Sequence, residues 1–191
     1  MGSPFNGDTF IEQEFLNLRD KYSLTTAVET GTNHGDTTVW LARNFRKTVS
    51  CEIDHGLIQE CTKKFSEEKV HVELFHGSSE KMLDYAIPHR GIGHDTIFFL
   101  DAHWNSYCPL LDELEAIAKY ELLPVIAIHD FKVPGGGLGF DGYNGQEYTF
   151  DWIKPKVDKI YSFKNRGYKH YYNTPEKACG AMRGVIYIVP A

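Results

Sequence analysis

The sequence has few cysteines, and their spacing is not that of a metal or redox pair. The four stand far apart, at Cys51, Cys61, Cys108 and Cys179, so no C-x-x-C motif occurs. With so few cysteines in 191 residues, the chain is not a disulfide scaffold. We therefore expect a reducing, cytoplasmic location.

Long apolar runs, internal repeats and clusters of basic residues are also missing. No apolar run approaches a membrane span, and the N-terminus shows no apolar signal region. The 20 Lys and Arg residues against 26 Asp and Glu residues give a formal net charge of -6. An acidic chain without a basic patch repels a phosphate backbone. We therefore expect neither a membrane nor a nucleic acid as a partner.

The apolar residues that are present form short runs rich in β-branched residues or Phe, and these runs alternate with helical patterns. This alternation predicts βαβ units and one α/β domain over residues 1–191, with an N-terminal helix region at 1–22. The fold expected is doubly wound, with a seven-stranded, mostly parallel sheet and a terminal antiparallel hairpin. We expect strands at 26–29, 48–52, 70–75, 96–101 and 125–129, closing strands at 168–172 and 184–189, and helices at 9–22, 36–46, 57–65, 110–120 and 152–160.

A glycine-rich segment at 131–146 follows the fifth expected strand. A loop this long without secondary structure is typical of a functional lid or of a disordered segment. It leaves the sheet at the edge where ligands bind in doubly wound folds. Its glycines allow closure, and Phe140, Tyr143 and the following Tyr148 would give an apolar wall with polar tips. We expect a lid here, the alternative being a flexible surface loop.

The segment ETGTNHG, residues 29–35, lies between the first expected strand and a helix. Its glycines, Gly31 and Gly35, permit positive φ and let the backbone approach a ligand closely. The helix behind them presents free N–H groups to an anionic group. The carboxylate of Glu29 at the strand end would repel a pyrophosphate and suits a cationic ligand. The alternative is a turn that merely joins a strand to a helix.

A second acidic residue, Glu52, ends the second expected strand, 23 residues after Glu29. A carboxylate there can accept hydrogen bonds from both hydroxyls of a ribose. Asp54 competes for this role, and a solvated acidic turn is the structural alternative.

On these motifs the chain resembles class I S-adenosylmethionine-dependent methyltransferases, in particular small-molecule O-methyltransferases. The resemblance covers 27–189: ETGTNHG is similar to the family's first motif, CEID to its second, and the terminal hairpin to its reversed final strand pair. HGSSEKML (76–83) is similar to the segment that meets the adenine amino group, and FLDAHW (99–104) to one that binds a cation and lies near the adenine. FLDAHW departs from that pattern by one extra residue before His103. The residues this implies for cofactor binding are Glu29, Gly31, Thr32, Asn33, Gly35, Glu52, Ser78, Ser79, Asp101 and Trp104.

The same resemblance implies a divalent cation such as Mg or Mn at the ends of the fourth and fifth strands. Asp101 and Asp130 end these neighbouring strands, and a cation would relieve their mutual repulsion. The family's third ligand directly follows the second Asp, where this chain has Phe131, which cannot ligate. His103 and His129 would supply nitrogen and shift the preference toward Mn, Fe or Zn. The ligands we expect are Asp101, Asp130 and His103.

Methyl transfer is an in-line displacement, so the protein mainly positions the acceptor and removes its proton. The candidate bases are His103, His129 and Asp130. Adjacent residues of a strand point to opposite faces, so only one of His129 and Asp130 should face the acceptor unless the strand has already ended. The acceptor expected is a small hydroxyl-bearing molecule under the 131–146 lid, and a homodimer is left open.

Other functions stay open at this point. A nicotinamide-dependent oxidoreductase would need a G-x-G-x-x-G turn, and this turn has two glycines only. A non-catalytic S-adenosylmethionine-binding protein would keep Glu29 and Glu52 but lack a base. Nucleobase N-methyltransferases carry an Asn/Asp-Pro-Pro-Tyr/Phe segment where this chain has Asp101-Ala102-His103-Trp104. Asp112 and Glu113 are expected to form the charged first turn of a helix, which suits the helix dipole.

Overall fold

The computed structural model describes residues 2–103, 107–162 and 166–191. A short 3-10 helix at Pro4–Gly7 comes first. The helices that follow are α1 (Thr9–Tyr22), α2 (Asp36–Asn44), α3 (His55–Glu67), α4 (Ser79–His89), α5 (Leu110–Ala118) and α6 (Phe150–Tyr161). The strands are β1 (Thr26–Thr30), β2 (Lys47–Glu52), β3 (Glu73–His76), β4 (Thr96–Leu100), β5 (Val125–Ile128), β6 (Gly142–Tyr143), β7 (Gln146–Glu147), β8 (Tyr168–Tyr172) and β9 (Ile186–Pro190).

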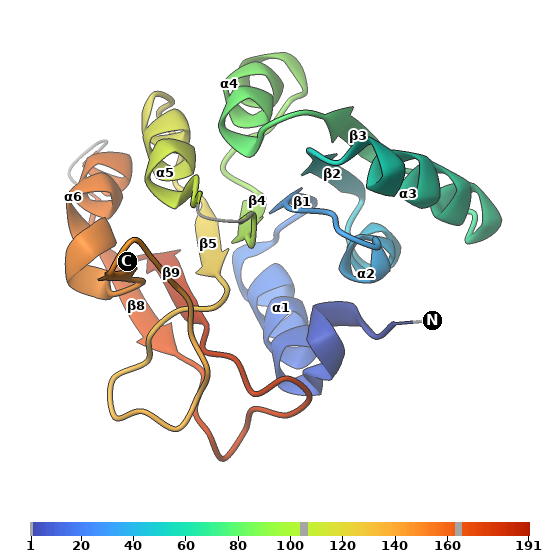
Figure 1. Ribbon diagram of the computed structural model, residues 1–191. Coiled ribbons are helices and arrows are strands. Elements are labelled where there is room, and N and C mark those ends of the chain that lie inside the picture. The colour runs from blue at the N-terminus through green and yellow to red at the C-terminus, as the bar shows by residue number, and fades with distance from the viewer. Residues whose placement is uncertain (1, 104–106, 163–165) are drawn as a thin grey trace.

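Seven strands form one sheet in the order β3-β2-β1-β4-β5-β9-β8 (Figure 1). Strands β1 to β5 are parallel, and β9 inserts antiparallel between β5 and β8. The strand order reverses between β1 and β4, which is where doubly wound folds bind ligands. The predicted fold class, a mostly parallel sheet with an antiparallel pair at its end, is confirmed.

Helices cover both faces of this sheet (Figure 1). Because strand residues alternate between faces, β4 sends Phe98 and Leu100 into the core under α4, α5 and α6. Ile97 and Phe99 of the same strand enter the core that α1 and α2 cover. Helix α3 packs beside α2, where Cys61 and Phe65 meet Val39. Packing on both faces therefore fixes the position of the carboxyl ends of the strands, where the site lies.

Local signals explain some helix boundaries. Helix α1 begins after Asp8, whose Oδ1 accepts hydrogen bonds from the backbone N–H groups of Phe10 and Ile11. The predicted helix at 9–22 is therefore confirmed at both ends. Helix α4 had no counterpart among the expected elements. Pro88 lies near its C-terminal end and weakens its sequence signal.

The segment at 131–146 differs from its prediction. The expectation of a loop without regular structure is wrong, because β6 and β7 pair there as a two-stranded hairpin. The backbone N–H of Phe131 donates to the carbonyl of Gly184, and that of Gly139 to Met182. The segment is thus tied to the chain just before β9. The third strand also starts later than the expected residue 70, at Glu73.

Over the described ranges, none of the helices combines the length and the apolar character that crossing a membrane requires.

Candidate active site

A cavity of about 1000 Å³ opens at the carboxyl ends of β1, β2, β4 and β5. It brings together most of the residues predicted from the sequence, although they are spread over a hundred positions of the chain. Those that line it are Glu29, Gly31, Thr32, Asn33, Gly35, Glu52, Ser79, Asp101, His103, His129 and Asp130. Trp104 lies outside the described residues.

The turn after β1 approaches β4 closely. Gly31 has a φ of 81°, and a Cβ atom there would lie 3.0 Å from the Cα of Ala102. Any other residue would be strained in this conformation and would press on the chain after β4. The turn is also tied to β2, since the backbone N–H of Thr32 donates to the carbonyl of Cys51. Glycine at this position therefore keeps the floor of the cavity open.

Backbone groups hold the carboxylate of Glu52 in one orientation. Its Oε2 accepts from the N–H of Asn33 at 2.8 Å, and its Oε1 from the N–H groups of Ile53 and Asp54 at 2.8 and 2.9 Å. Asp54, the competing candidate, instead caps α3 by accepting from the N–H of Leu57. Both acids line the cavity, but Glu52 is the one whose carboxylate backbone N–H groups hold between the turn and α3.

Glu29 is almost fully buried at the end of β1. Its Oε2 accepts hydrogen bonds from the hydroxyls of Thr38 at 2.5 Å and Ser50 at 2.6 Å. Burial raises the pKa of this carboxyl to about 8. In the absence of a cation the side chain is therefore largely protonated at neutral pH.

A second buried carboxyl, Glu113, lies behind Ser79. The expected place of Glu113 in the first helical turn is confirmed, but the side chain is 1% exposed and does not form part of a solvated face. Its Oε1 and the Oγ of Ser79 are buried with no hydrogen-bond partner among the described residues. Burial raises the pKa of Glu113 to about 7. Ser79 lines the cavity, whereas the hydroxyl of Ser78 donates to Glu80.

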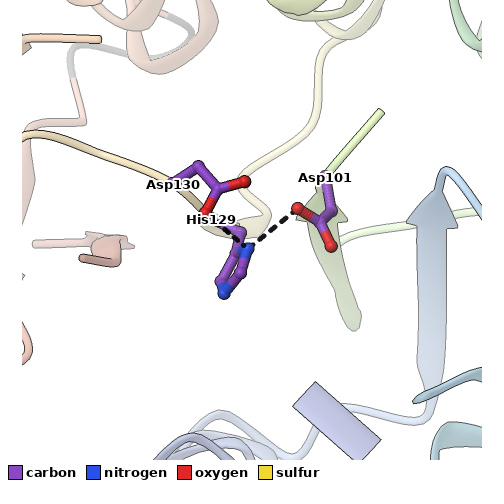
Figure 2. Close-up of side chains that lie close together, drawn as sticks. All are labelled: Asp101, His129 and Asp130. Atoms are coloured by element: carbon purple, nitrogen blue, oxygen red, sulfur yellow. Dashed lines mark hydrogen bonds and ion pairs between the residues drawn. The ribbon is translucent and has the colours of Figure 1, made fainter. Parts of the chain in front are cut away.

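His129 lies between two carboxylates. Figure 2 shows one ring nitrogen directed at both Asp101 and Asp130, with Nδ1 2.9 Å from Oδ1 of Asp101 and 3.3 Å from Oδ1 of Asp130. Strand β5 has ended at Ile128 and Asp130 has a φ of 55°, so the alternation of a strand no longer applies. His129 and Asp130 therefore both reach the cavity.

The pKa values of this cluster are coupled through its geometry. Burial alone would lower the pKa of His129, but the carboxylates of Asp101 and Asp130 outweigh it and raise that pKa to about 10. Burial would likewise raise the pKa of Asp130, but hydrogen bonds from His103, His129 and Arg183 hold it well below its usual range. An ionised Asp130 beside a protonated His129 is the resulting state.

His103 is the more accessible histidine, with a side chain 38% exposed against 3% for His129. Its Nε2 lies 3.5 Å from Oδ2 of Asp130 and 3.9 Å from Oδ2 of Asp141. The hydrogen bond with Asp130 raises the pKa of His103. Tyr143 of the β6–β7 hairpin lies with its ring centroid 6.0 Å from that of His103.

Two residues of this cluster, Arg183 and Asp141, were not predicted from the sequence. Arg183 donates to Asp130 and to Asp141, forming ion pairs with both. Arg183 lies 53 residues from Asp130 along the chain, and no short motif surrounds it. Only the antiparallel insertion of β9 beside β5 brings it to this place.

The predicted metal ligands do not form one group. Ligand atoms of Asp101, His129 and Asp130 lie within 4.8 Å of one another, and so do those of His103, Asp130 and Asp141. Asp101 and His103, both expected around one ion, thus fall into different groups. The residue after Asp130 is Phe131, which is buried. Its ring stacks on that of Tyr172, with the two ring centroids 6.2 Å apart.

The N-terminal segment also reaches the cavity. Asn6 and Gly7 line it, and the carbonyl of Asn6 accepts from the N–H of Ala181. Sequence patterns gave no indication of this, because the contact depends on the packing of Phe5 against Phe15 and Phe99.

No family model and no curated protein sequence matches this chain. Solved structures match its fold. An O-methyltransferase from Bacillus cereus in complex with SAH aligns with a TM-score of 0.66 and 19% identity, over 95% of this chain and 81% of that one. TomG from Streptomyces achromogenes is an O-methyltransferase involved in tomaymycin synthesis and was solved with SAM. It aligns with a TM-score of 0.64 and 15% identity, over 95% of this chain and 80% of that one.

An rRNA methylase from Streptococcus thermophilus gives a TM-score of 0.59 and 13% identity, over 94% of this chain and 96% of that one. At these identities the likeness defines the fold. The chain has the seven-stranded Rossmann-like fold of methyltransferases, as its motifs predict. These similar structures include O-methyltransferases and an rRNA methylase, and the fold alone does not assign an activity or a substrate to this chain.

Proposed function

We propose that this protein transfers a methyl group from S-adenosylmethionine to a hydroxyl group of a small molecule. One observation carries the proposal. A single cavity joins Glu29 and Glu52, which suit the cofactor, to Asp101, His103 and Asp130, which suit proton transfer. A nicotinamide enzyme fits less well, because Glu29 would face a pyrophosphate.

The cavity residues fit the cofactor by their chemistry. When bound, S-adenosylmethionine supplies an electrophilic methyl group on a cationic sulfur. Glu29, in its ionised form, offers a negative charge for the cationic methionine end. Glu52 is held by three backbone N–H groups and keeps lone pairs for the ribose hydroxyls. Gly31 lets the turn pack against the backbone of Asp101 and Ala102, which a side chain would prevent.

His103 is the base that the geometry supports best. It lines the cavity, it is the more exposed of the two histidines, and its Nε2 is near the carboxylates of Asp130 and Asp141. Glu29 and Glu52 would hold S-adenosylmethionine, which would supply the methyl group, and His103 would accept the proton that the acceptor hydroxyl loses. Asp130 orients His103, and His129 stays between its two carboxylates. Of the other two predicted bases, Asp130 is ionised, whereas His129 is protonated and fits the role of a base less well.

The small size of the acceptor is supported by charge and by the loops around the site. The chain carries a net charge of -6, which opposes a nucleic-acid acceptor. The β6–β7 hairpin brings Tyr143 close to His103, as expected of a lid over residues 131–146. The lid, a cytoplasmic location and a homodimer stay predictions. Cation assistance is not part of the proposal, because Arg183 already neutralises Asp130.

The test has two stages. Calorimetric titration with S-adenosylhomocysteine should give a stoichiometric complex, whereas no binding at about 1 mM ligand would contradict cofactor use. A panel of hydroxyl-bearing small molecules should then be assayed with S-adenosylmethionine by formation of S-adenosylhomocysteine. Binding without turnover of any acceptor would favour the non-catalytic alternative. Methylation of ribosomal RNA instead would overturn the acceptor class.

A further inference from the structure

Arg183 is the residue of the site that neither the motifs nor the proposed methyl transfer assigns. Its guanidinium bridges Asp130, at the end of β5, and Asp141, just before β6, through one ion pair with each carboxylate. The Oδ1 atom of each acid takes part in this bridge. The Oδ2 atoms of both acids instead lie toward Nε2 of His103.

The backbone on both sides holds this bridge in place. The N–H of Gly139 donates to the carbonyl of Met182, and the N–H of Gly184 donates to the carbonyl of Gly139, both at 2.8 Å. The N–H of Asp141 donates to the carbonyl of Asp130 at 2.9 Å. A Cβ atom on Gly139 would lie 2.9 Å from Nη1 of Arg183, so glycine leaves room for the guanidinium. Arg183 is therefore built into the site and is not a freely moving surface side chain.

This arrangement fits a divalent cation poorly. Mg is bound through one or two carboxylates together with waters, and carboxylates also suit Mn. A carboxylate that is already paired with a cation of the chain is a poor ligand for such an ion. Here one oxygen of Asp130 and one of Asp141 already accept from Arg183, and a second cation this close would be repelled. The residue after Asp130, Phe131, offers no ligand atom. The carboxylates are already compensated from within the chain.

We propose that the guanidinium of Arg183 takes the place of a divalent cation in this site. Arg183 is a positioning residue: it neutralises Asp130 and Asp141 and fixes the two oxygens that hold His103. The site then needs no metal ion for the proposed methyl transfer. This last statement rests on the proposed function, whereas the charge compensation by Arg183 does not. Removal of the guanidinium leaves clustered carboxylates and histidines, which is the donor set of a manganese site.

The experiment measures binding of Mn²⁺ by electron paramagnetic resonance, with no cofactor and no acceptor present. The wild-type protein should not bind Mn²⁺ at about 0.1 mM. Arg183→Ala should bind one equivalent at least about tenfold more tightly than the wild type, because the two carboxylates have lost the guanidinium between them. Arg183→Lys keeps a cation at this place and should behave as the wild type. Arg43→Ala, which removes an arginine paired with Glu68 on the surface, is the matched control and should also behave as the wild type.

Two outcomes would overturn the proposal. One is stoichiometric binding of Mn²⁺ to the wild-type protein at micromolar concentration, which needs no variant and holds even where Arg183→Ala fails to fold. The other is a folded Arg183→Ala protein that binds Mn²⁺ no better than the wild type. Once an acceptor is known, turnover should be unchanged in excess chelator. Failure of methyl transfer itself would leave the Mn²⁺ result intact, so the two proposals fail separately.

Discussion

The backbone N–H of Asn33 donates to Oε2 of Glu52 at 2.8 Å, which ties the turn after β1 to the end of β2. The turn after β1 and the end of β2, which flank the proposed ribose site, are therefore both held by the carboxylate of Glu52. Glu52→Ala should weaken binding of S-adenosylhomocysteine by at least about tenfold, since a hydrogen bond to a charged group contributes about 1.5–3 kcal/mol. Calorimetric titration measures this.

The control for Glu52 is Glu67→Ala, which removes an exposed carboxylate from α3 and should leave the affinity unchanged. Thermal unfolding of both variants shows whether the turn has loosened. Unchanged affinity in a folded Glu52→Ala protein would remove Glu52 from the ribose site.

Binding of S-adenosylmethionine should depend on pH through Glu29. Burial raises the pKa of Glu29 to about 8, so below this pH the free protein holds a proton that a cationic ligand must displace. The affinity should therefore rise with pH from about 5.5 to about 7.5, by up to about tenfold per unit. Titrations in buffers of different ionisation enthalpy should also detect release of this proton.

Glu29→Gln cannot ionise and is the matched variant for this effect. It should bind more weakly at about pH 7.5 and lose both the slope and the proton release. An equal slope in the two proteins would assign the pH dependence to another group.

Stability should depend on pH through Glu113. Burial raises its pKa to about 7 in the folded protein, from an ordinary value of 4.5. The folded state then binds more protons than the unfolded state between these values, so Glu113 lowers the free energy of unfolding as pH rises through them. Glu113→Gln should match the wild type near pH 5 and exceed it near pH 8 by up to about 3 kcal/mol.

Urea unfolding at several pH values measures the difference between the two proteins, in which effects of other groups cancel. Glu121→Gln, an exposed carboxylate after α5, is the control and should give a difference near zero throughout. A difference for Glu113→Gln that does not change with pH would show that this carboxyl titrates normally.

The lid prediction can be tested at Tyr143. Its ring stacks on Tyr148, which in turn stacks on Trp152, and its other side approaches His103. Tyr143→Ala should raise the KM for the acceptor about tenfold through loss of an aromatic contact, while affinity for S-adenosylhomocysteine stays the same. An unchanged KM would place the acceptor nearer the N-terminal segment, where Asn6 and Gly7 line the cavity.

Much of the fold could be predicted because each element carries its own signal. The strands β1, β2, β4 and β5 are short and buried, and their expected ranges agree with the structure to within one residue at either end. Helix α1 has an N-cap at Asp8, and its expected range of 9–22 is the one observed. Helix α4 was missed because Pro88 blurs its end. The regular structure in 131–146 was missed because β6 and β7 are only two residues each.

The site divides in the same way. Glu29, Glu52 and the glycine turn lie within motifs of fixed spacing, so the sequence was enough to bring them together. The bridge from Arg183 to Asp141 depends on packing between segments 42 residues apart, which no local pattern records. Glu113 was expected only as part of the charged first turn of a helix, because an acid there suits the helix dipole and the sequence pattern gives no sign of burial. Its burial follows from the way α5 packs against the sheet.

The position of β9 has a consequence for biosynthesis. This strand comes last in the sequence yet lies inside the sheet, between β5 and β8, and Arg183 directly precedes it. While a ribosome is still making the chain, β5 has an open edge and Asp130 lacks the ion pair with Arg183. A nascent or prematurely terminated chain can therefore contain the whole glycine turn at 29–35 and still lack the bridge from Arg183 to Asp130 and Asp141. Completion of the sheet and of the Arg183 bridge is thereby delayed until β9 has been synthesised.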